Sequence, residues 1–338
     1  TGMESAKLVR EMLLNENTIH QIISLLGESF EDVNVETSIL IVQKGCSNSK
    51  QILYQTVDNK EIDCSNFYDI EPVIWQKNRN YLFDTSSSPE ESEILTKIKS
   101  DTILLEDKYD VRVGLQAYET GKGTPKQTKD DVKNHIYDYD YKFDNTTFKY
   151  LGGADVGRYS LEWSGQWLKY GKWLSQPKSF DQFSKKRILI REISGKYPQL
   201  IQANYVEGTF LNNKSILNVL EKDDSYSLEF LLGILNSKLM SFYHKRQTVK
   251  GNRTLFPKIV IRDLKNYPIP KQHNDDITQL VSQILIIKHE NSESDTRDLE
   301  DNIDSLVYRL YNLTYGEVKI IDSEFEMVKE EYENLKIN

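Results

Sequence analysis

Charge is distributed very unevenly along this chain. Residues 151–272 contain 20 Lys and Arg against 10 Asp and Glu, although the formal net charge of the whole chain is -9. Residues 1–150 contain 17 basic and 26 acidic residues, and residues 273–338 contain 6 and 16. Segregation of this kind creates a local positive field, which the sequence pI of about 5.3 conceals. A polyanionic partner is therefore expected at residues 151–272, called the basic segment below, with a solvated surface over an aromatic core as the alternative.

Aromatic residues gather in the same segment. Three of the four tryptophans, Trp163, Trp167 and Trp173, fall within eleven residues. Cationic side chains that can contact phosphates, interleaved with flat rings, are typical of nucleic-acid-binding surfaces. Because tryptophan more often fills a core than forms a stacking platform, packing is the first role expected of these rings.

Length and composition indicate an ordinary globular protein. A chain of 338 residues with 38% hydrophobic residues can form two domains with cores of their own. No run approaches the length of a membrane span and no signal peptide is recognisable, so a cytoplasmic protein is expected. The two cysteines, Cys46 and Cys64, have no partners at metal-ligand spacing and are expected to be free thiols.

The N-terminal region reads as an incomplete α/β unit. Leu8 and Met12 stand at i,i+4 spacing in a predicted helix, and β-branched runs at 19–25 and 35–44 predict buried strands. A sheet this small does not bury both faces alone. We therefore expect residues 1–45 to be the truncated edge of a larger α/β sheet.

The rest of the chain divides into three parts, which gives an α+β fold class overall. Residues 46–100 contain one probable strand and a Ser-rich turn, and are expected to be a connector. Short β-like runs separated by Gly, Pro and Asn turns predict a β-rich domain over residues 101–272. Apolar residues at helical spacing predict a helical tail over residues 273–338.

Common catalytic motifs are absent from this sequence. It has no G-x-G-x-x-G after a strand, no G-x-x-x-x-G-K-[ST] phosphate loop, no H-E-x-x-H and no Cys/His cluster. The glycines of LGGADVG (151–157) are interpreted as turn residues, because no suitable helix pattern follows. We therefore predict no catalytic, cofactor-binding or metal-binding residues in this chain.

Six blocks of sequence carry a resemblance to a known family. They are GLQAYETGKGTP (114–125), YLGGADVGRYSLEW (150–163), YGKWLSQP (170–177), KRILIREISG (186–195), LLGILNSKLMSFYHKR (231–246) and NYPIPK (266–271). Their order and spacing resemble the C-terminal specificity domain of Taq-type N6-adenine DNA methyltransferases, including the fused restriction and modification enzymes of type IIG. Residues 5–44 look like the last helix and strands of the catalytic domain in that family, and residues 298–317 like its closing helices.

The resemblance implies a DNA target-recognition domain at 101–272, preceded at 1–45 by the edge of a methyltransferase domain. Enzymes of this family bind S-adenosylmethionine through a Gly-containing turn and hold the extruded adenine with an Asn/Asp-Pro-Pro-Tyr/Phe loop. Neither motif is present, and the chain has no Pro-Pro dipeptide. We therefore expect a piece of a longer enzyme that recognises double-stranded DNA, while the cofactor belongs to the missing methyltransferase half.

Ten side chains are candidates for DNA contact. Phosphate contact is expected of Lys122, Lys126, Lys245, Arg246, Lys250 and Arg253. Base reading is expected of Arg158, Tyr159, Arg191 and Lys196. Each lysine taken singly is also compatible with an ordinary solvated charge.

Two alternatives remain open. The chain could retain part of a cofactor or nuclease site, which predicts cofactor binding or metal-dependent cleavage. It could also be a subunit-interaction module resembling a separate specificity subunit, which predicts assembly through the acidic residues 273–338.

Overall fold

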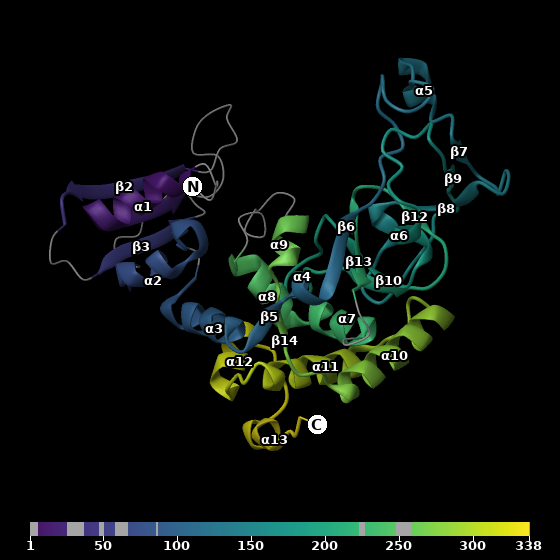
Figure 1. The fold of residues 1–338 in the computed structure, drawn as a ribbon. Helices are drawn as coiled ribbons and strands as arrows, with labels where there is room; N and C mark the ends of the chain where they lie inside the picture. Colours follow the sequence, from purple (N-terminus) through teal and green to yellow (C-terminus); the bar gives the residue numbers. More distant parts are fainter. Residues whose placement is uncertain are drawn as a thin grey trace. The chain divides into compact units, whose positions relative to one another are not determined.

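The computed structural model describes residues 6–25, 37–46, 51–57, 67–85, 87–222, 227–247 and 258–337. The chain forms two compact units, and the boundary between them falls at Thr96 and Lys97. The N-terminal unit comprises the described residues as far as Thr96, and the C-terminal unit those from Lys97 onward (Figure 1). Among the described residues, no helix is both long and apolar enough to cross a membrane.

The N-terminal unit is built on a four-stranded sheet. Its strands, in spatial order, are β2 (Thr37–Lys44), β1 (Asn17–Leu25), β3 (Ile52–Val57) and β4 (Tyr68–Ile70). β1 pairs antiparallel with β2 and parallel with β3. The helices of this region are α1 (Lys7–Glu16), α2 (Pro72–Lys77), the short η2 (Arg79–Tyr81) and α3 (Pro89–Lys99), whose last residues belong to the C-terminal unit. Ile22, Tyr54 and Trp75 form the centre of the core.

Two expectations for this region are wrong. Residues 46–100 are not a separate connector, because β3 and β4 extend the sheet that β1 and β2 begin. The helix α1 does form, but Leu8 is 75% exposed and Met12 44%, whereas Arg10 and Leu14 are buried. The second wrong expectation is the buried strand at 35–44: β2 does form there, but its apolar residues 39–42 are exposed because β2 is an edge strand.

The C-terminal unit contains two four-stranded sheets, which confirms the predicted β-rich region and the α+β class. One sheet has the order β11 (Ala203–Val206), β10 (Arg187–Arg191), β13 (Ile216–Glu221), β6 (Tyr109–Val113). The other has the order β12 (Leu211–Asn212), β8 (Thr147–Leu151), β9 (Trp167–Lys169), β7 (Asp138–Tyr139). A two-stranded sheet joins β5 (Thr102–Leu104) to β14 (Pro268–Pro270).

Short helices lie between these strands, and most of the other helices in the second half of the chain are longer. The short ones are α4 (Leu105–Lys108), α5 (Lys129–Asn134), η3 (Gly153–Asp155), α6 (Asp181–Ser184) and α9 (Ile261–Lys265). The later ones are α7 (Leu228–Asn236), α8 (Lys238–Gln247), α10 (Asp275–Glu290), α11 (Arg297–Leu310), α12 (Tyr315–Ile321) and α13 (Lys329–Asn334). Ser227 caps α7 and Asn274 caps α10, since each side chain accepts a hydrogen bond from a first-turn amide.

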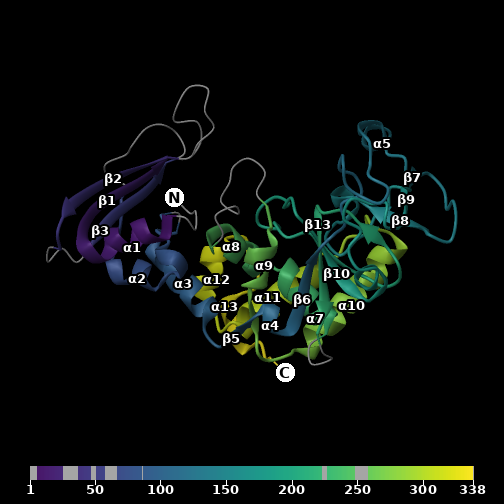
Figure 2. The same cartoon turned by 45° about the horizontal axis from the view of Figure 1, so that its top comes forward.

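The helical tail is part of the C-terminal unit and not a separate appendage. Figures 1 and 2 show α10 and α11 lying beside α7. Gly233 of α7 allows this close approach, because a Cβ there would stand 2.6 Å from Ile277 Cγ2 and 3.1 Å from Val281 Cγ2. The tail thus buries its apolar face against α7, which corrects the predicted boundary at residue 273.

Gly233→Ala is predicted to destabilise the protein. Alanine favours helix by about 1 kcal/mol over glycine, but overpacking against Ile277 costs about 1–3 kcal/mol, so a net loss is expected. Gly316→Ala on α12 is the matched control, because no atom lies within 4 Å of the added Cβ. Thermal unfolding of both variants checks this, and equal melting temperatures would contradict the close packing.

Candidate nucleic-acid interface

Lys122 and Lys126 lie exposed on a loop that Gln127 holds in place. The buried Gln127 amide donates from Nε2 to the carbonyls of Ala117 (2.7 Å) and Trp173 (2.9 Å). Its Oε1 accepts from the amide of Glu119 at 2.9 Å. With three hydrogen bonds to backbone groups, Gln127 fixes the loop so that both lysines face outward.

Two glycines complete this loop. Gly121 and Gly123 have φ angles of +80° and +83°, which L side chains rarely adopt. At Gly123 a Cβ would also stand 2.2 Å from the carbonyl oxygen of Trp173. The Gly-rich sequence therefore reflects a tight, built turn, and not a flexible tether for the lysines.

Arg191 and Lys196 lie near one end of the β11-β10-β13-β6 sheet. Arg191 is the last residue of β10, pairs with Ile216 of β13 and is partly exposed. Lys196 is exposed in the turn that follows, where its carbonyl accepts from the amide of Gln199 at 2.9 Å. Both residues are thus accessible beside the end of a strand, whereas a base contact by either stays a prediction.

The same turn meets α8. The Nζ atom of Lys245 lies 4.2 Å from the centroid of the Tyr197 ring, a cation–π contact. The hydroxyl of Tyr197 donates to the carbonyl of Ile321 at 3.0 Å. Lys196 and Lys245, which are 49 positions apart in the sequence, are therefore brought to one region of the C-terminal unit.

The structure describes only one of the three other cations that are predicted to contact phosphate near Lys245. Arg246 is partly exposed in the last turn of α8. Lys250 and Arg253 lie outside the described residues. Figures 1 and 2 show α5, which follows directly after the Lys122–Lys126 loop, far from α8. The candidate phosphate contacts thus form two separate groups and not one.

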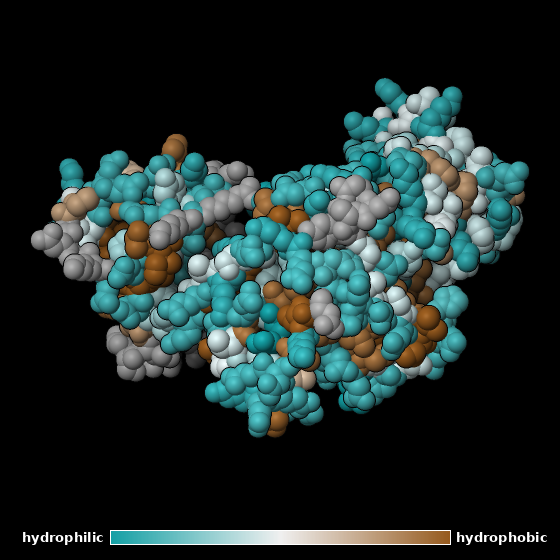
Figure 3. Space-filling model, turned by 60° about the horizontal axis from the view of Figure 1, so that its bottom comes forward, coloured by the Kyte–Doolittle hydropathy of each residue, from teal (hydrophilic) through white to brown (hydrophobic). Residues whose placement is uncertain are grey.

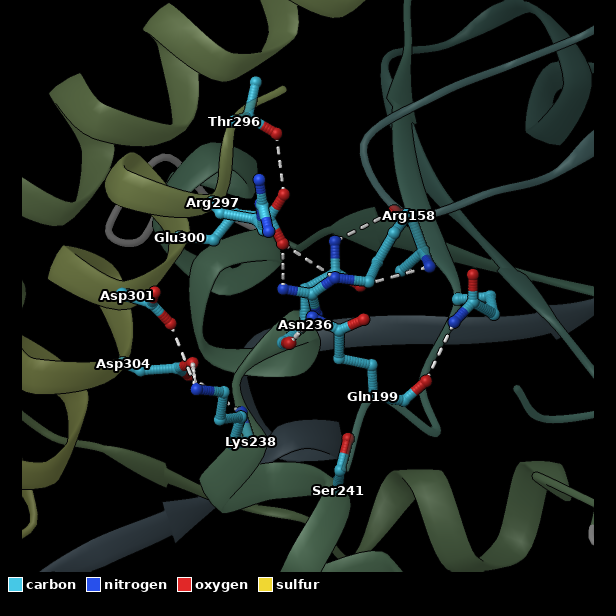
Figure 4. Close-up of polar contacts among 12 residues, drawn as sticks. Arg158, Gln199, Asn236, Lys238, Ser241, Thr296, Arg297, Glu300, Asp301 and Asp304 are labelled. Carbon is cyan, nitrogen blue, oxygen red and sulfur yellow. Dashed lines mark hydrogen bonds and ion pairs between the residues drawn. The ribbon is translucent and has the colours of Figure 1, made fainter. Parts of the chain in front are cut away.

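Arg158 and Tyr159 occupy the interior. Arg158 Nε donates to Glu300 Oε2 at 2.9 Å, and its guanidinium also bonds the carbonyl of Asn236 (Figure 4). The side chains of Arg158 and Glu300 are only 11% and 13% exposed. Tyr159 is 2% exposed, and its amide donates to the carbonyl of Ala203 at 2.9 Å. Both side chains therefore make their contacts inside the fold and are not exposed for base reading.

Lys238 forms the centre of an adjoining ionic cluster, which is largely buried except for Asp301. Its Nζ atom lies 2.9 Å from Asp322 Oδ2, 3.0 Å from Asp301 Oδ1 and 3.8 Å from Asp304 Oδ2. The amide of Lys238 also donates to Asp304 Oδ1 at 2.8 Å. With Arg158 and Glu300 included, two cations meet four carboxylates. Burial raises the pKa of Asp304 to about 7, against the opposing effect of the nearby Arg158 and Lys238.

The titration of Asp304 predicts a pH-dependent stability. The pKa of this carboxyl is higher in the folded state than in the unfolded state. Its contribution to the free energy of unfolding is therefore complete at low pH and is lost as pH rises through about 7. Between about pH 5 and about pH 8, the wild type is expected to lose on the order of 1–3 kcal/mol relative to Asp304→Asn. Melting temperatures measured across that range check this, and parallel curves for the two proteins would contradict it.

The described residues offer no evident place for a metal ion. None of them form a group of three or more His, Cys, Asp or Glu suited to hold one. Cys46 is exposed and free. The described residues do offer exposed cations on rigid supports, such as Lys122 and Lys126 on the loop that Gln127 holds.

Comparison with known proteins defines the class of this region. Residues 148–269 match the family model of the TaqI-like C-terminal specificity domain. The resemblance drawn from the six sequence blocks is thereby confirmed, and the match coincides closely with the basic segment.

Relatives extend the likeness beyond the specificity domain. Over 328 residues the chain is 25% identical to a putative type II restriction enzyme and methyltransferase of Methanocaldococcus jannaschii. That alignment covers 92% of this chain and 26% of the relative, so the chain spans about a quarter of that protein.

Solved structures show where the fold recurs. The type IIL restriction-modification enzyme MmeI, solved in complex with DNA, matches with a TM-score of 0.56 at 12% identity, over 98% of this chain and 48% of that one. The type IIG restriction endonuclease BpuSI matches with a TM-score of 0.41 at 12% identity, over 92% of this chain and 46% of that one. The chain shares its overall fold with part of MmeI.

Proposed function

We propose that this chain is the DNA target-recognition part of a restriction-modification N6-adenine methyltransferase. The observation that carries the proposal is the coincidence of the specificity-domain match at 148–269 with the net-positive residues 151–272. Phosphate contacts fix the register of such a protein on the duplex, and side chains at base edges read the sequence. Exposed cations at Lys122, Lys126 and Lys196 support this role.

Catalysis is assigned to a missing half of the same polypeptide. Methylation of adenine requires the base to be extruded into a pocket, and the residues that form such a pocket in the family have no counterpart here. The missing half would also bind S-adenosylmethionine. On this proposal the present chain binds DNA without turnover, and calorimetry with S-adenosylmethionine gives no binding heat.

Salt dependence of binding to duplex DNA tests the proposal. Each neutralised phosphate adds about 0.9 to the slope of log K against log salt, so changing Lys245, Arg246, Lys250 and Arg253 together to Ala is expected to flatten that slope by roughly 3–4. Affinity should fall alike for every duplex. Lys329→Ala on α13, where the lysine pairs with Glu333, is the control and should leave the slope unchanged.

Base reading produces a different defect. Arg191→Ala is expected to cost about 1–3 kcal/mol on the preferred sequence, selected from a random pool, and little on other DNA. A wild-type chain that binds no duplex at any salt concentration would overturn the proposed function. If the quadruple variant keeps the parental slope, only the predicted phosphate contacts around α8 are contradicted.

The exposed apolar surface of the N-terminal unit supports the assignment of a missing half. β2 is the edge strand of its sheet and exposes Ile39, Leu40, Ile41 and Val42, which lie on both of its faces. Figure 3 shows hydrophobic residues on the surface of this unit, at the left of the view. Edge strands exposed in this way favour pairing with further strands. We assign the whole β2-β1-β3-β4 sheet, and not residues 1–45 alone, to the edge of the methyltransferase sheet, with β2 covered by the missing half.

Lysine substitutions on β2 test this assignment. Leu40→Lys with Val42→Lys is expected to change the melting temperature of the present chain little, because both positions are already exposed. In the full-length polypeptide the same pair should cost about 2–5 kcal/mol, since charges would then be buried without partners. Val328→Lys, at a 62% exposed position, is the control for both proteins. Equal, small effects in both would show that nothing covers β2.

A further inference from the structure

The two faces of the β12-β8-β9-β7 sheet have different surroundings. One face carries the core cluster that contains Leu168, and the other joins a second core cluster at Leu151 but leaves several side chains partly exposed. Phe148 of β8 and Leu168 of β9 are paired in register and belong to the core cluster on one face. Because side chains alternate along a strand, Lys149 and Trp167, the next pair in register, belong to the opposite face. Tyr139 of β7 pairs with Trp167 on that same face. All three of these side chains are partly exposed.

Aromatic rings form two contacting pairs on this face, which the strand pairing of Tyr139 with Trp167 brings side by side. Trp163 meets Trp167 edge to face at a centroid distance of 5.3 Å. At the other end Tyr139 stacks on Phe143 at 4.7 Å, and Phe143 is 48% exposed. These four residues, called the aromatic strip, thus run outward from the sheet into the exposed loop that contains Tyr141. The three tryptophans of the basic segment are all partly exposed, and none lies in the centre of a core.

Lys149 places an uncompensated cation beside the strip. Its Nζ atom lies 4.7 Å from the centroid of the Trp163 ring and 5.7 Å from that of Phe210. Within the part of the chain that the structure describes, no carboxylate forms an ion pair with it. Lys169, on the same face, is different, because its Nζ atom lies 2.9 Å from Asp144 Oδ2. The rings hold the Lys149 ammonium in place while leaving its charge available to an anion.

We infer that this face, with Lys149 at its centre and the aromatic strip beside it, binds the sugar–phosphate strand of a nucleic acid. A phosphate supplies the anion that Lys149 lacks, and flat rings suit the sugars or bases next to that phosphate. The inference rests on the proposed function and adds a third contact region to the two groups of cations described above. None of the ten residues selected from the sequence belongs to this region.

Lys149→Met tests the inference, because methionine keeps most of the aliphatic stem between the rings and removes the charge. The probes are a fluorescent mixed-sequence duplex and the single strand of the same sequence, titrated over a range of salt concentrations. Lys149→Met is expected to flatten the salt slope by about 0.9 on the duplex and by about 0.7 on the single strand, the values for one phosphate. Lys149→Arg, which keeps a cation, should retain the parental slope. Tryptophan fluorescence of the wild type should change on binding.

The controls separate this inference from the proposed function. Melting temperatures establish that each variant is folded, and Lys329→Met on α13 should retain the parental slope. If Lys149→Met flattens the salt slope with both probes, the result supports a backbone contact. If it flattens the slope with the single strand alone, the face binds an unpaired strand. If the wild type binds DNA and Lys149→Met keeps its slope on both probes, the inference fails and the proposed function stands. If the wild type binds neither probe, both fail.

Discussion

Buried charge that must be neutralised organises the C-terminal unit. Arg158 lies in the loop after η3 and Lys238 at the start of α8, and both are largely excluded from solvent. An unpaired charge in such a place costs several kcal/mol, so partners are obligatory. The partners come from the tail, Glu300 from α11 and Asp322 from the end of α12. The acidic tail is therefore required at this place in the fold, because it neutralises the buried cations Arg158 and Lys238.

A second buried arginine shows that the basic segment is not all available for binding. Arg187 of β10 is completely buried and donates to Asn218 Oδ1 and to the carbonyls of Lys185 and Phe210. Desolvation lowers its pKa to about 10. Phe210 directly precedes β12, so this arginine connects the two four-stranded sheets. Counts of charge along a sequence therefore overstate the positive surface, and the cations that remain exposed carry the argument for binding.

Features that depend on periodicity and motif order could be predicted from the sequence. The positions of side chains that depend on tertiary contacts could not. Strands and helices of the C-terminal unit followed from apolar spacing, and the specificity domain from six ordered blocks. The interior position of Arg158 did not follow, because a residue after a Gly-Gly turn is equally compatible with a surface loop, and its partner Glu300 is 142 positions away. Lys149 was missed because it precedes the basic segment by two positions. Only the register of β8 with β9, and not local composition, places it beside the tryptophans.

The free edge of β2 also bears on how this chain behaves by itself. A strand with apolar residues on both faces and an unpaired row of amides and carbonyls can add a second copy of itself as readily as a different partner. Two chains joined in this way would make one continuous sheet, and each would hide the apolar strand of the other. Self-pairing of this kind would increase with the concentration of the chain. In a longer polypeptide that already occupies this edge, the same strand would have no such tendency.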